Sequence, residues 1–372
     1  HKQLRTFMFP TKIQDILQRI QQVDPVQYAS SRNFSDGAVT YLGPYLSRGV
    51  ISTKQVFDHL TSLNLPWQHI EKLVQELAWR DYWQNIWVAK GESINKDLKH
   101  PQQPLSNHKI STGIVEHNTG IHAIDSAIKD LYKKGYMHNH MRMYVACVAC
   151  NIAQSHWLTP ARWMYYHLLD GDWASNALSW QWVAGCNASR KYYANQDNIN
   201  KYFKSSQKQT FLDIEYGEFN TLATPEALLE FSDFIPLTNL TDTPDVQLER
   251  DKKTLVYNYY NLDPDWWADE EVQRVLLLEP SFFKTYPVSQ KCIEFVLQLA
   301  DNIAGIKIMV ADFEILAQKI DPAHIIYKEH PTNQHYHGQQ ESRSWMFPVS
   351  GEYSSFFAFW KKCKKLIPAQ GL

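Results

Sequence analysis

Residues 168–182 concentrate side chains whose types can do chemistry. Asp170 and Asp172 flank a glycine, Asn176 follows shortly after them, and three tryptophans surround the group. Carboxylates pair with guanidinium groups, amides donate and accept hydrogen bonds, and indole rings stack on planar partners. A turn with two solvated acids beside core aromatics is the alternative interpretation. The segment alone leaves both interpretations open.

Two segments nearer the N-terminus carry residues of the same kinds. Asn139, Arg142 and Met143 lie three and four residues apart, so they share one face of a helix. Glu76 and Trp79 share a face in the same way. In a purely structural helix, the methionine and the tryptophan would fill a core and the glutamate would lie at the surface. The functional alternative uses the same residues to hold a ligand.

Composition describes an ordinary globular chain with an aromatic bias. The 372 residues suffice for two domains, 44% are hydrophobic, 20% are charged, and aromatics reach 13% with 13 tryptophans. No apolar run is long enough to span a membrane and no secretory signal is visible, so we expect a cytoplasmic protein with no membrane partner. The odd count of 5 cysteines fits reduced thiols in that compartment.

The net charge of −2 hides an asymmetry between two parts of the chain. Residues 1–215 hold 23 Lys and Arg against 17 Asp and Glu, whereas residues 216–372 hold 14 against 22. A basic first part permits nucleic-acid binding, because neutralising phosphates drives such binding. A mild excess of lysine is also typical of a solvated surface, so the charge alone favours no partner.

Two groups of residues have the types of metal ligands. Cys147 and Cys150 form a CxxC in an apolar helical run, but no second pair supplies tetrahedral ligands, so we expect them to pack in the core. The second group combines histidines with an acid in the tail, where a polar loop is the favoured interpretation: Glu329, His330, His335 and His337. We therefore expect no metal site.

Apolar periodicity predicts the elements that position these residues. Helices are expected over residues 11–20, 52–60, 67–89, 121–134 and 137–156. Prolines among Thr, Asp and Asn predict a linker over 216–250 with one short helix. Beyond it strands alternate with helices, which implies βαβ units on a parallel sheet. The strands are expected at 274–278, 306–310 and 324–327, and the helices at 289–304 and 313–320.

The order of three motifs is specific. Glu-Leu-Ala-Trp-Arg at 76–80, Asn-His-Met-Arg-Met at 139–143 and Asp-Gly-Asp at 170–172 together resemble the FAD-binding helical domain of the DNA photolyase and cryptochrome family. The resemblance covers roughly residues 28–203. It implies a mainly α fold in which an all-helical photolyase-type FAD-binding domain precedes a small α/β, Rossmann-like domain. The expected divisions are 1–215, the linker 216–250, and 251–372.

The placement of the α/β part differs from the family pattern. Photolyases normally carry an antenna-binding α/β domain before the helical domain, whereas here a smaller α/β unit follows it. This unit is either that domain moved to the other end of the chain or an unrelated appendage. We expect it to pack on its own helical domain and not to bind DNA, because its acidic charge repels phosphates.

The resemblance implies FAD as the cofactor and assigns its contacts by position. It places Asp170 beside Arg142 at the flavin ring, where the pair fixes the orientation and tunes the electronics of the ring, and Asn176 opposite flavin N5, as in many photolyases. Within 39–46, the phosphate-binding element, Thr40 alone keeps a hydroxyl of the family pattern, so we expect weaker binding. The implied cofactor-binding residues are Tyr28, Arg32, Thr40, Leu42, Arg80, Asn139, Arg142, Asp170, Asp172 and Asn176.

The resemblance also implies residues that meet a lesion in DNA. Trp79 and Trp182 would stack on a flipped-out pyrimidine dimer, and Glu76 would bond the base carbonyls and stabilise the dimer radical anion. Met143 and Asn139 match enzymes that repair cyclobutane pyrimidine dimers, since relatives acting on (6-4) photoproducts carry His at both positions.

Electron supply to the flavin is the point at which the chain departs most from the family. Trp157 and Trp180 match two members of the tryptophan chain that carries electrons from the surface. The third should lie within 98–115, which contains no Trp, Tyr or Phe. Photoreduction is therefore expected to be slower, rerouted through Trp163 or Trp173, or absent.

Three functions follow from the resemblance. The first is a deoxyribodipyrimidine photolyase, an enzyme that repairs cyclobutane dimers in damaged DNA by light-driven electron transfer from reduced FAD. The second is a cryptochrome-like photoreceptor or flavin redox sensor, which the altered phosphate element and the incomplete tryptophan chain favour. The third is a scaffold that kept the fold and lost the flavin.

Overall fold

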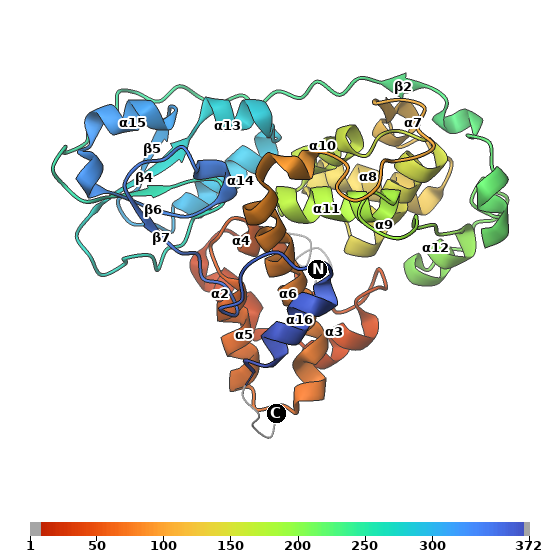
Figure 1. Ribbon diagram of the computed structural model, residues 1–372, viewed down its shortest axis with the longest axis horizontal. Coiled ribbons are helices and arrows are strands. Elements are labelled where there is room, and N and C mark those ends of the chain that lie inside the picture. Colours follow the sequence, from red (N-terminus) through yellow and green to blue (C-terminus); the bar gives the residue numbers. More distant parts are fainter. Residues whose placement is uncertain (1–8, 368–372) are drawn as a thin grey trace. The chain divides into compact units, whose positions relative to one another are not determined.

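A computed structural model describes residues 9–367 of the chain (Figure 1). Its contacts group the residues into two compact units. The first unit comprises the N-terminal residues up to Val23, Thr40–Ala89 and the residues from Leu237 onward, and the second comprises Asp24–Val39 and Lys90–Pro236. Each unit is therefore built from segments that are not contiguous in the sequence. The predicted division into residues 1–215, 216–250 and 251–372 stays a prediction.

The first unit combines helices with a parallel sheet. Its helices are α2 (Ile13–Gln21), α4 (Gly43–Ser47), α5 (Thr53–Ser62), α6 (Trp67–Lys90), α13 (Pro280–Thr285), α14 (Gln290–Ala300), α15 (Phe313–Lys319) and α16 (Phe356–Lys364), with 3₁₀ turns at Pro322–His324 and Pro331–Asn333. Its strands are β3 (Thr254–Tyr257), β4 (Gln273–Leu278), β5 (Lys307–Val310), β6 (Ile325–Lys328) and β7 (Gln339–Glu341).

The five strands pair in the order β5-β4-β3-β6-β7, and every neighbouring pair is parallel. Residues of β3 and β4 are buried throughout, as expected for strands covered on both faces. Val256 faces Val275 across the central pair, and both belong to an apolar core with Phe313 and Leu316 of α15. The parallel sheet predicted for the tail is confirmed.

The second unit is helical. Its elements are α3 (Pro25–Ser31), α7 (Thr112–Val115), α8 (His122–Lys134), α9 (Asn139–Ala146), α10 (Leu158–His167), α11 (Trp173–Ala184) and α12 (Gln196–Phe203). A 3₁₀ turn at Gly91–Asn95 and a π-helix at Cys147–Ile152 interrupt them. Strands β1 (Ile110–Ser111) and β2 (Phe231–Ser232) pair antiparallel.

The segment at 216–250 corrects one expectation. Instead of one short helix, two 3₁₀ turns at Tyr216–Thr221 and Glu226–Leu228 precede β2. The remaining backbone after β2 up to β3 has no regular element, as its prolines predict.

The helix predicted at 137–156 ends earlier than expected. Its regular α part is α9, and the turn that follows opens into the π-helix, which carries Cys147 and Cys150 in the buried interior. Burial raises the pKa of Cys147 to about 12 and that of Cys150 above its ordinary value, so both thiols stay protonated at neutral pH. Protonated, buried thiols behave as small apolar residues.

Candidate functional site

Arg142 and Asp170 form an ion pair in the second unit. Arg142 Nη2 donates to Asp170 Oδ2 at 2.8 Å, and Arg142 Nε donates to the carbonyl of Met137 at 2.8 Å. The two side chains are 21% and 12% exposed. Burial opposes the guanidinium charge, but the Asp170 carboxylate outweighs it and raises the pKa of Arg142. The guanidinium is therefore charged, and the pair is fixed in orientation with both side chains partly exposed.

A glycine brings the two motifs of this pair together. Gly135 ends α8 with φ +70°, and its carbonyl accepts the N–H of Leu169 at 2.9 Å. A Cβ on Gly135 would come within 2.6 Å of the Leu169 side chain. The absent side chain thus lets the residues before α9 lie against the residues before α11, which sets Arg142 opposite Asp170.

Asp172 has a role in helix geometry. Its side chain caps α11, accepting the N–H of Ser175 at 3.0 Å and the Ser175 hydroxyl at 2.6 Å. Asn176, one residue further on, uses Nδ2 to donate to the carbonyl of Ala161 at 2.8 Å. That bond uses one of the two amide N–H donors, so the second N–H and the acceptor Oδ1 can both meet a ligand.

The remaining predicted residues of the second unit differ in exposure. Asn139 is exposed and Met143 is half-buried. Trp182 is 40% exposed, which is high for a tryptophan, and its ring centroid lies 5.7 Å from that of Tyr192. Tyr28 lies on α3, and Arg32, at the C-terminal end of that helix, donates to the carbonyl of Ala29 at 2.8 Å.

The phosphate-binding element predicted at 39–46 contains a hydrogen bond between two of its own residues. The Thr40 hydroxyl accepts the N–H of Leu42 at 3.3 Å, and the Leu42 side chain is buried in the core of the first unit. On α6, Arg80 donates to the Ser47 hydroxyl and Glu76 lies 3.2 Å from the Lys72 ammonium. Each of these side chains has a partner within its own unit.

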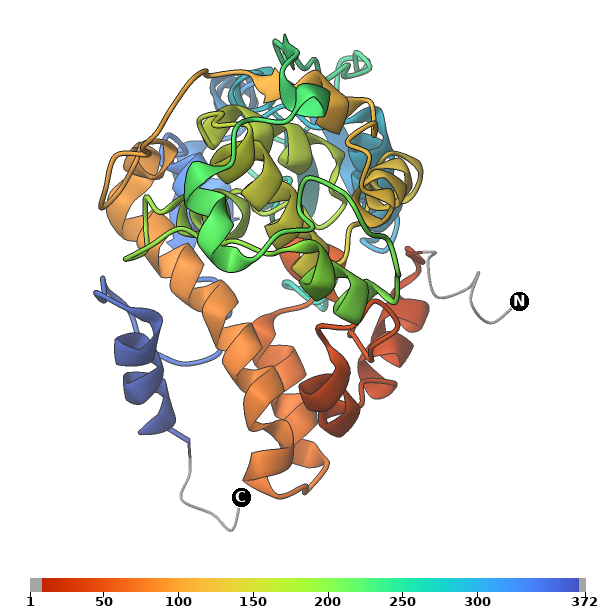
Figure 2. The ribbon, with the colours of Figure 1, turned by 90° about the vertical axis from the view of Figure 1, so that its right-hand side faces the viewer.

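Trp79 stacks on an aromatic residue near the C-terminus. Its ring lies face to face with that of Phe356, with centroids 3.9 Å apart and planes at 10°. The stack continues from Phe356 to Trp360 and from Trp360 to Trp67, with centroids at 6.2 and 6.4 Å. Figure 2 shows α16, in dark blue, running beside α6, in orange. The sequence interpretation did not include this helix, although its Phe-Phe-Ala-Phe-Trp run is an aromatic signal.

The predicted cofactor and lesion residues divide between the two units. Thr40, Leu42, Glu76, Trp79 and Arg80 belong to the first unit. The second unit holds the others: Tyr28, Arg32, Asn139, Arg142, Met143, Trp157, Asp170, Asp172, Asn176, Trp180 and Trp182. Within the second unit, the structure brings Arg142 and Asp170 into direct contact; the roles of all these residues stay predictions.

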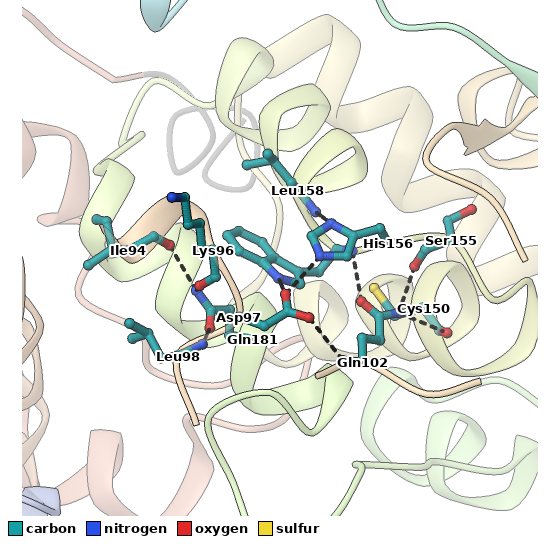
Figure 3. A network of polar contacts seen from close by, with 11 residues as sticks. Ile94, Lys96, Asp97, Leu98, Gln102, Cys150, Ser155, His156, Leu158 and Gln181 are labelled. Carbon is teal, nitrogen blue, oxygen red and sulfur yellow. Dashed lines mark hydrogen bonds and ion pairs between the residues drawn. The ribbon is translucent and has the colours of Figure 1, made fainter. Parts of the chain in front are cut away.

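Trp157 is fully buried, and its indole N–H meets a carboxylate. Trp157 Nε1 donates to Asp97 Oδ1 at 2.8 Å. The other oxygen of Asp97 accepts the N–H of Gln102 at 2.9 Å, and His156 Nε2 lies 2.8 Å from Oδ1 (Figure 3). Asp97 was missed from the sequence, because a single aspartate in a Lys-rich loop carries no pattern.

The two tryptophans considered for a rerouted electron path are also buried. Trp163 Nε1 donates to the Tyr132 hydroxyl at 3.1 Å, and Trp173 Nε1 donates to Asn95 Oδ1 at 2.7 Å. Both acceptors are neutral groups. Trp157 differs from these two tryptophans because its acceptor is a carboxylate.

The histidines and acid considered as metal ligands in the tail engage separate partners. His335 Nε2 lies 2.8 Å from Glu279 Oε2, His330 Nδ1 lies 2.7 Å from the Thr332 hydroxyl, and Glu329 pairs with Arg343 at 2.8 Å. Over residues 9–367, no helix combines the length and hydrophobicity needed to cross a bilayer.

Comparisons with known proteins agree on one domain. Residues 73–214 match the family model described as FAD binding domain of DNA photolyase. A deoxyribodipyrimidine photo-lyase of Alkalihalophilus pseudofirmus is 26% identical over 42% of this chain and 34% of its own length, and one of Vibrio cholerae is 30% identical over 43% and 36%. Cryptochrome-1 of Arabidopsis thaliana is 23% identical over 46% and 27%.

A solved structure shows a weaker likeness. A Synechocystis cryptochrome aligns with a TM-score of 0.47 at 21% identity, over 52% of this chain and 44% of that one. The chain spans about a third of the length of the curated relatives it matches.

Proposed function

We propose, from the match of residues 73–214 to the FAD-binding domain of DNA photolyases, that the chain binds FAD and repairs cyclobutane pyrimidine dimers in DNA by light-driven electron transfer. The observation that carries the proposal is the ion pair of Arg142 and Asp170, which lies in the matched region with both side chains partly exposed. A preformed charge pair orients a polar ring system without reorganising when the ring binds.

The residues present fit a flavin in its reduced form. The Asn176 amide donates one N–H to Ala161, and its Oδ1 is an acceptor. An acceptor suits the N–H that reduced flavin carries at N5. Bound reduced flavin supplies one electron to the substrate after absorbing light. The chain's own groups then hold the ring, with the Arg142 and Asp170 pair fixing its position.

The lesion contacts form the second part of the proposal. The Trp182 side chain is 40% exposed, and stacking of a base on an aromatic ring contributes roughly 1–3 kcal/mol. Extruding a damaged base costs a few kcal/mol, so stacking offsets much of that cost. Glu76 would hydrogen-bond the base carbonyls and stabilise negative charge on the dimer, and Met143 would contact the lesion. The basic first part of the chain is compatible with damaged DNA as the partner, although its charge alone does not select one.

A second function is favoured by one specific observation. Phe356 covers one face of the Trp79 ring, which the repair proposal needs for the lesion. A photoreceptor or flavin redox sensor without repair activity has no need of that face. In the phosphate-binding element at 39–46, Thr40 alone keeps a hydroxyl of the family pattern, which also favours the photoreceptor or redox sensor.

Two measurements separate these functions. Flavin absorbance of the purified chain, before and after incubation with FAD, tests cofactor binding. Repair of an oligonucleotide with a single thymine dimer, under blue light and in the dark, tests the enzyme. A flavin-loaded protein that repairs nothing would favour the photoreceptor, and a protein that takes up no FAD would contradict both proposals.

A further inference from the structure

The Asp97 carboxylate accepts a hydrogen bond from the indole nitrogen of Trp157. The hydrogen bond from Trp157 Nε1 to Asp97 Oδ1 is 2.8 Å long, and it joins residues 60 positions apart in the sequence. The tryptophan is buried completely, whereas the Asp97 side chain is 21% exposed. Asp97 therefore connects a buried indole N–H to the edge of the second unit.

The segment that carries Asp97 is held in place by a buried amide. Gln181 is fully buried on α11, and its Nε2 donates to the carbonyls of Ile94 and Lys96 at 2.8 and 3.0 Å. Its Oε1 accepts the N–H of Leu98 at 3.0 Å. These three bonds bracket Asp97 on both sides (Figure 3). The carboxylate position is thus fixed by the helix that also carries Trp180 and Trp182.

The carboxylate is oriented by groups on the facing segment. Gln102 donates its N–H to Asp97 Oδ2 at 2.9 Å, while its side-chain oxygen accepts the N–H of Trp157 at 3.0 Å. His156 Nδ1 accepts the N–H of Leu158 at 3.3 Å, so the ring proton lies on Nε2, which donates to Asp97. The histidine therefore holds the carboxylate and does not compete for a proton at Nε2.

The charge state of Asp97 suits a proton acceptor. Burial by itself disfavours the carboxylate, but the hydrogen bonds from Gln102, Trp157 and His156 outweigh burial and lower the pKa of Asp97. The Cys150 and Cys186 thiols also face it, and burial raises the pKa of both, that of Cys186 to about 12. With these thiols protonated, Asp97 carries the negative charge of the cluster at neutral pH.

We propose that Asp97 is the proton acceptor of Trp157 when that tryptophan is oxidised; the oxidant, a light-excited flavin, rests on the proposed function. Trp157 would give one electron to the flavin, and the N–H of the resulting cation would become far more acidic. The N–H bond then breaks, its electron pair stays on Nε1, and the proton moves to Asp97 Oδ1. The ring is left as a neutral radical and Asp97 as a carboxylic acid, which returns the proton to solvent through its exposed edge.

This step would compensate for the third tryptophan that the resemblance places within residues 98–115 and that the sequence lacks there. Residues 98–115 contain no aromatic residue of the Trp, Tyr or Phe type that could pass an electron inward to Trp157. Loss of the proton makes return of the electron from the flavin slow, because return then requires the proton as well. Asp97, directly before this region, therefore stabilises the charge separation that a third tryptophan would otherwise extend.

The test uses the full chain without flavin. An ultraviolet laser flash ejects electrons from indole rings whether they are buried or exposed, and transient absorption distinguishes the radical cation from the neutral radical. The difference between wild type and Trp157→Phe isolates the signal of Trp157. Asp97→Asn, which keeps the shape of the side chain, should slow its conversion from cation to neutral radical by on the order of 10²-fold.

Two controls make the outcome decisive. Asn95→Ala alters the neutral acceptor of Trp173 and should leave the Trp157 signal unchanged. In wild type, the conversion rate should fall only at a pH below the range in which carboxyl groups ordinarily titrate, because Asp97 is then protonated. In Asp97→Asn the rate should not depend on pH. Equal conversion rates in wild type and Asp97→Asn would overturn the proposal. Failure of FAD binding would contradict the proposed function and leave this test intact.

Discussion

The indole ring of Trp79 lies face to face with the phenyl ring of Phe356, 3.9 Å from centroid to centroid. Trp79 is on α6 and Phe356 begins α16, and both belong to the same compact unit. At this separation no base can enter between the rings, so α16 controls whether that face of Trp79 can stack on DNA. The repair proposal can therefore be tested at a single residue, Phe356.

Replacing Phe356 by Leu should expose the face of Trp79. If Trp79 is a lesion platform, affinity for dimer-containing DNA should rise about tenfold, because stacking contributes roughly 1–3 kcal/mol per base. The folded state should lose roughly 0.5–3 kcal/mol, as for ordinary core substitutions. Fluorescence-anisotropy titration with damaged and undamaged oligonucleotides measures the effect.

The neighbouring residue offers a matched control. Phe357 is 66% exposed and lies next to Phe356 on α16, so Phe357→Leu makes the same chemical change without uncovering Trp79. Affinity that rises equally in both variants would point to a non-specific effect. Affinity that rises in neither would remove Trp79 from the lesion contacts and favour the photoreceptor.

Asp170→Asn should lower flavin occupancy and stability together. It leaves the partly buried Arg142 guanidinium without its counter-charge, and breaking a buried ion pair costs roughly 3–5 kcal/mol. The ratio of flavin to protein absorbance and the thermal midpoint measure both effects. Asp36→Asn breaks an ion pair to Lys204 whose side chains are each 60% exposed, so it should change neither quantity. Identical behaviour of the two variants would contradict a special role for Asp170.

Several elements of this fold were predictable because their signal is local. The helices α5, α6 and α8 have apolar spacing and clear ends, such as the Ser52 cap of α5, and they are confirmed. The central strand β3 was missed because its Thr-Leu-Val-Tyr run is short and follows two lysines. Its identity as the sheet centre comes from pairing with β4 and β6 and not from its own pattern.

The residues of the candidate site also differ in whether the sequence carries a local signal for them. Arg142 and Asp170 could be proposed from motif resemblance, since each lies in a recognisable segment. The contacts of Trp157 with Asp97 and of Trp79 with Phe356 could not, because they join segments far apart in the sequence whose pairing depends on the whole unit. Periodicity shows which face of a helix is apolar and does not show what covers it.

Asp81 should give the protein a measurable pH dependence of stability. It is buried on α6, accepts the Thr53 hydroxyl at 3.1 Å and the N–H of Met346 at 2.9 Å, and burial raises its pKa from 3.8 to about 6. The folded state therefore binds the proton more tightly than the unfolded state. Stability from Asp81 is fully present below pH 3.8 and is lost as pH rises through about 6, by roughly 3 kcal/mol.

Two variants test whether Asp81 causes this pH dependence of stability. Asp81→Asn should remove the slope between pH 3.8 and about 6 from the denaturant-derived free energy of unfolding. Asp58→Asn, on an exposed side chain of α5 paired with Lys54, should retain it. A slope that persists in Asp81→Asn would assign it to other groups.

Glu76 should matter for chemistry more than for binding. Its carboxylate lies 3.2 Å from the Lys72 ammonium, and the two side chains are 32% and 34% exposed, so the group is available to a ligand. A hydrogen bond that strengthens only when the dimer gains an electron accelerates repair without tightening the ground state. Glu76→Gln should therefore lower the quantum yield of repair roughly tenfold, which is about 1.4 kcal/mol, and leave the Kd for damaged DNA nearly unchanged.

Lys72→Gln removes the ion pair and keeps the carboxylate, so its quantum yield should stay near that of wild type. A quantum yield that falls equally in both variants would assign the effect to the ion pair on α6 and not to contact between Glu76 and the lesion.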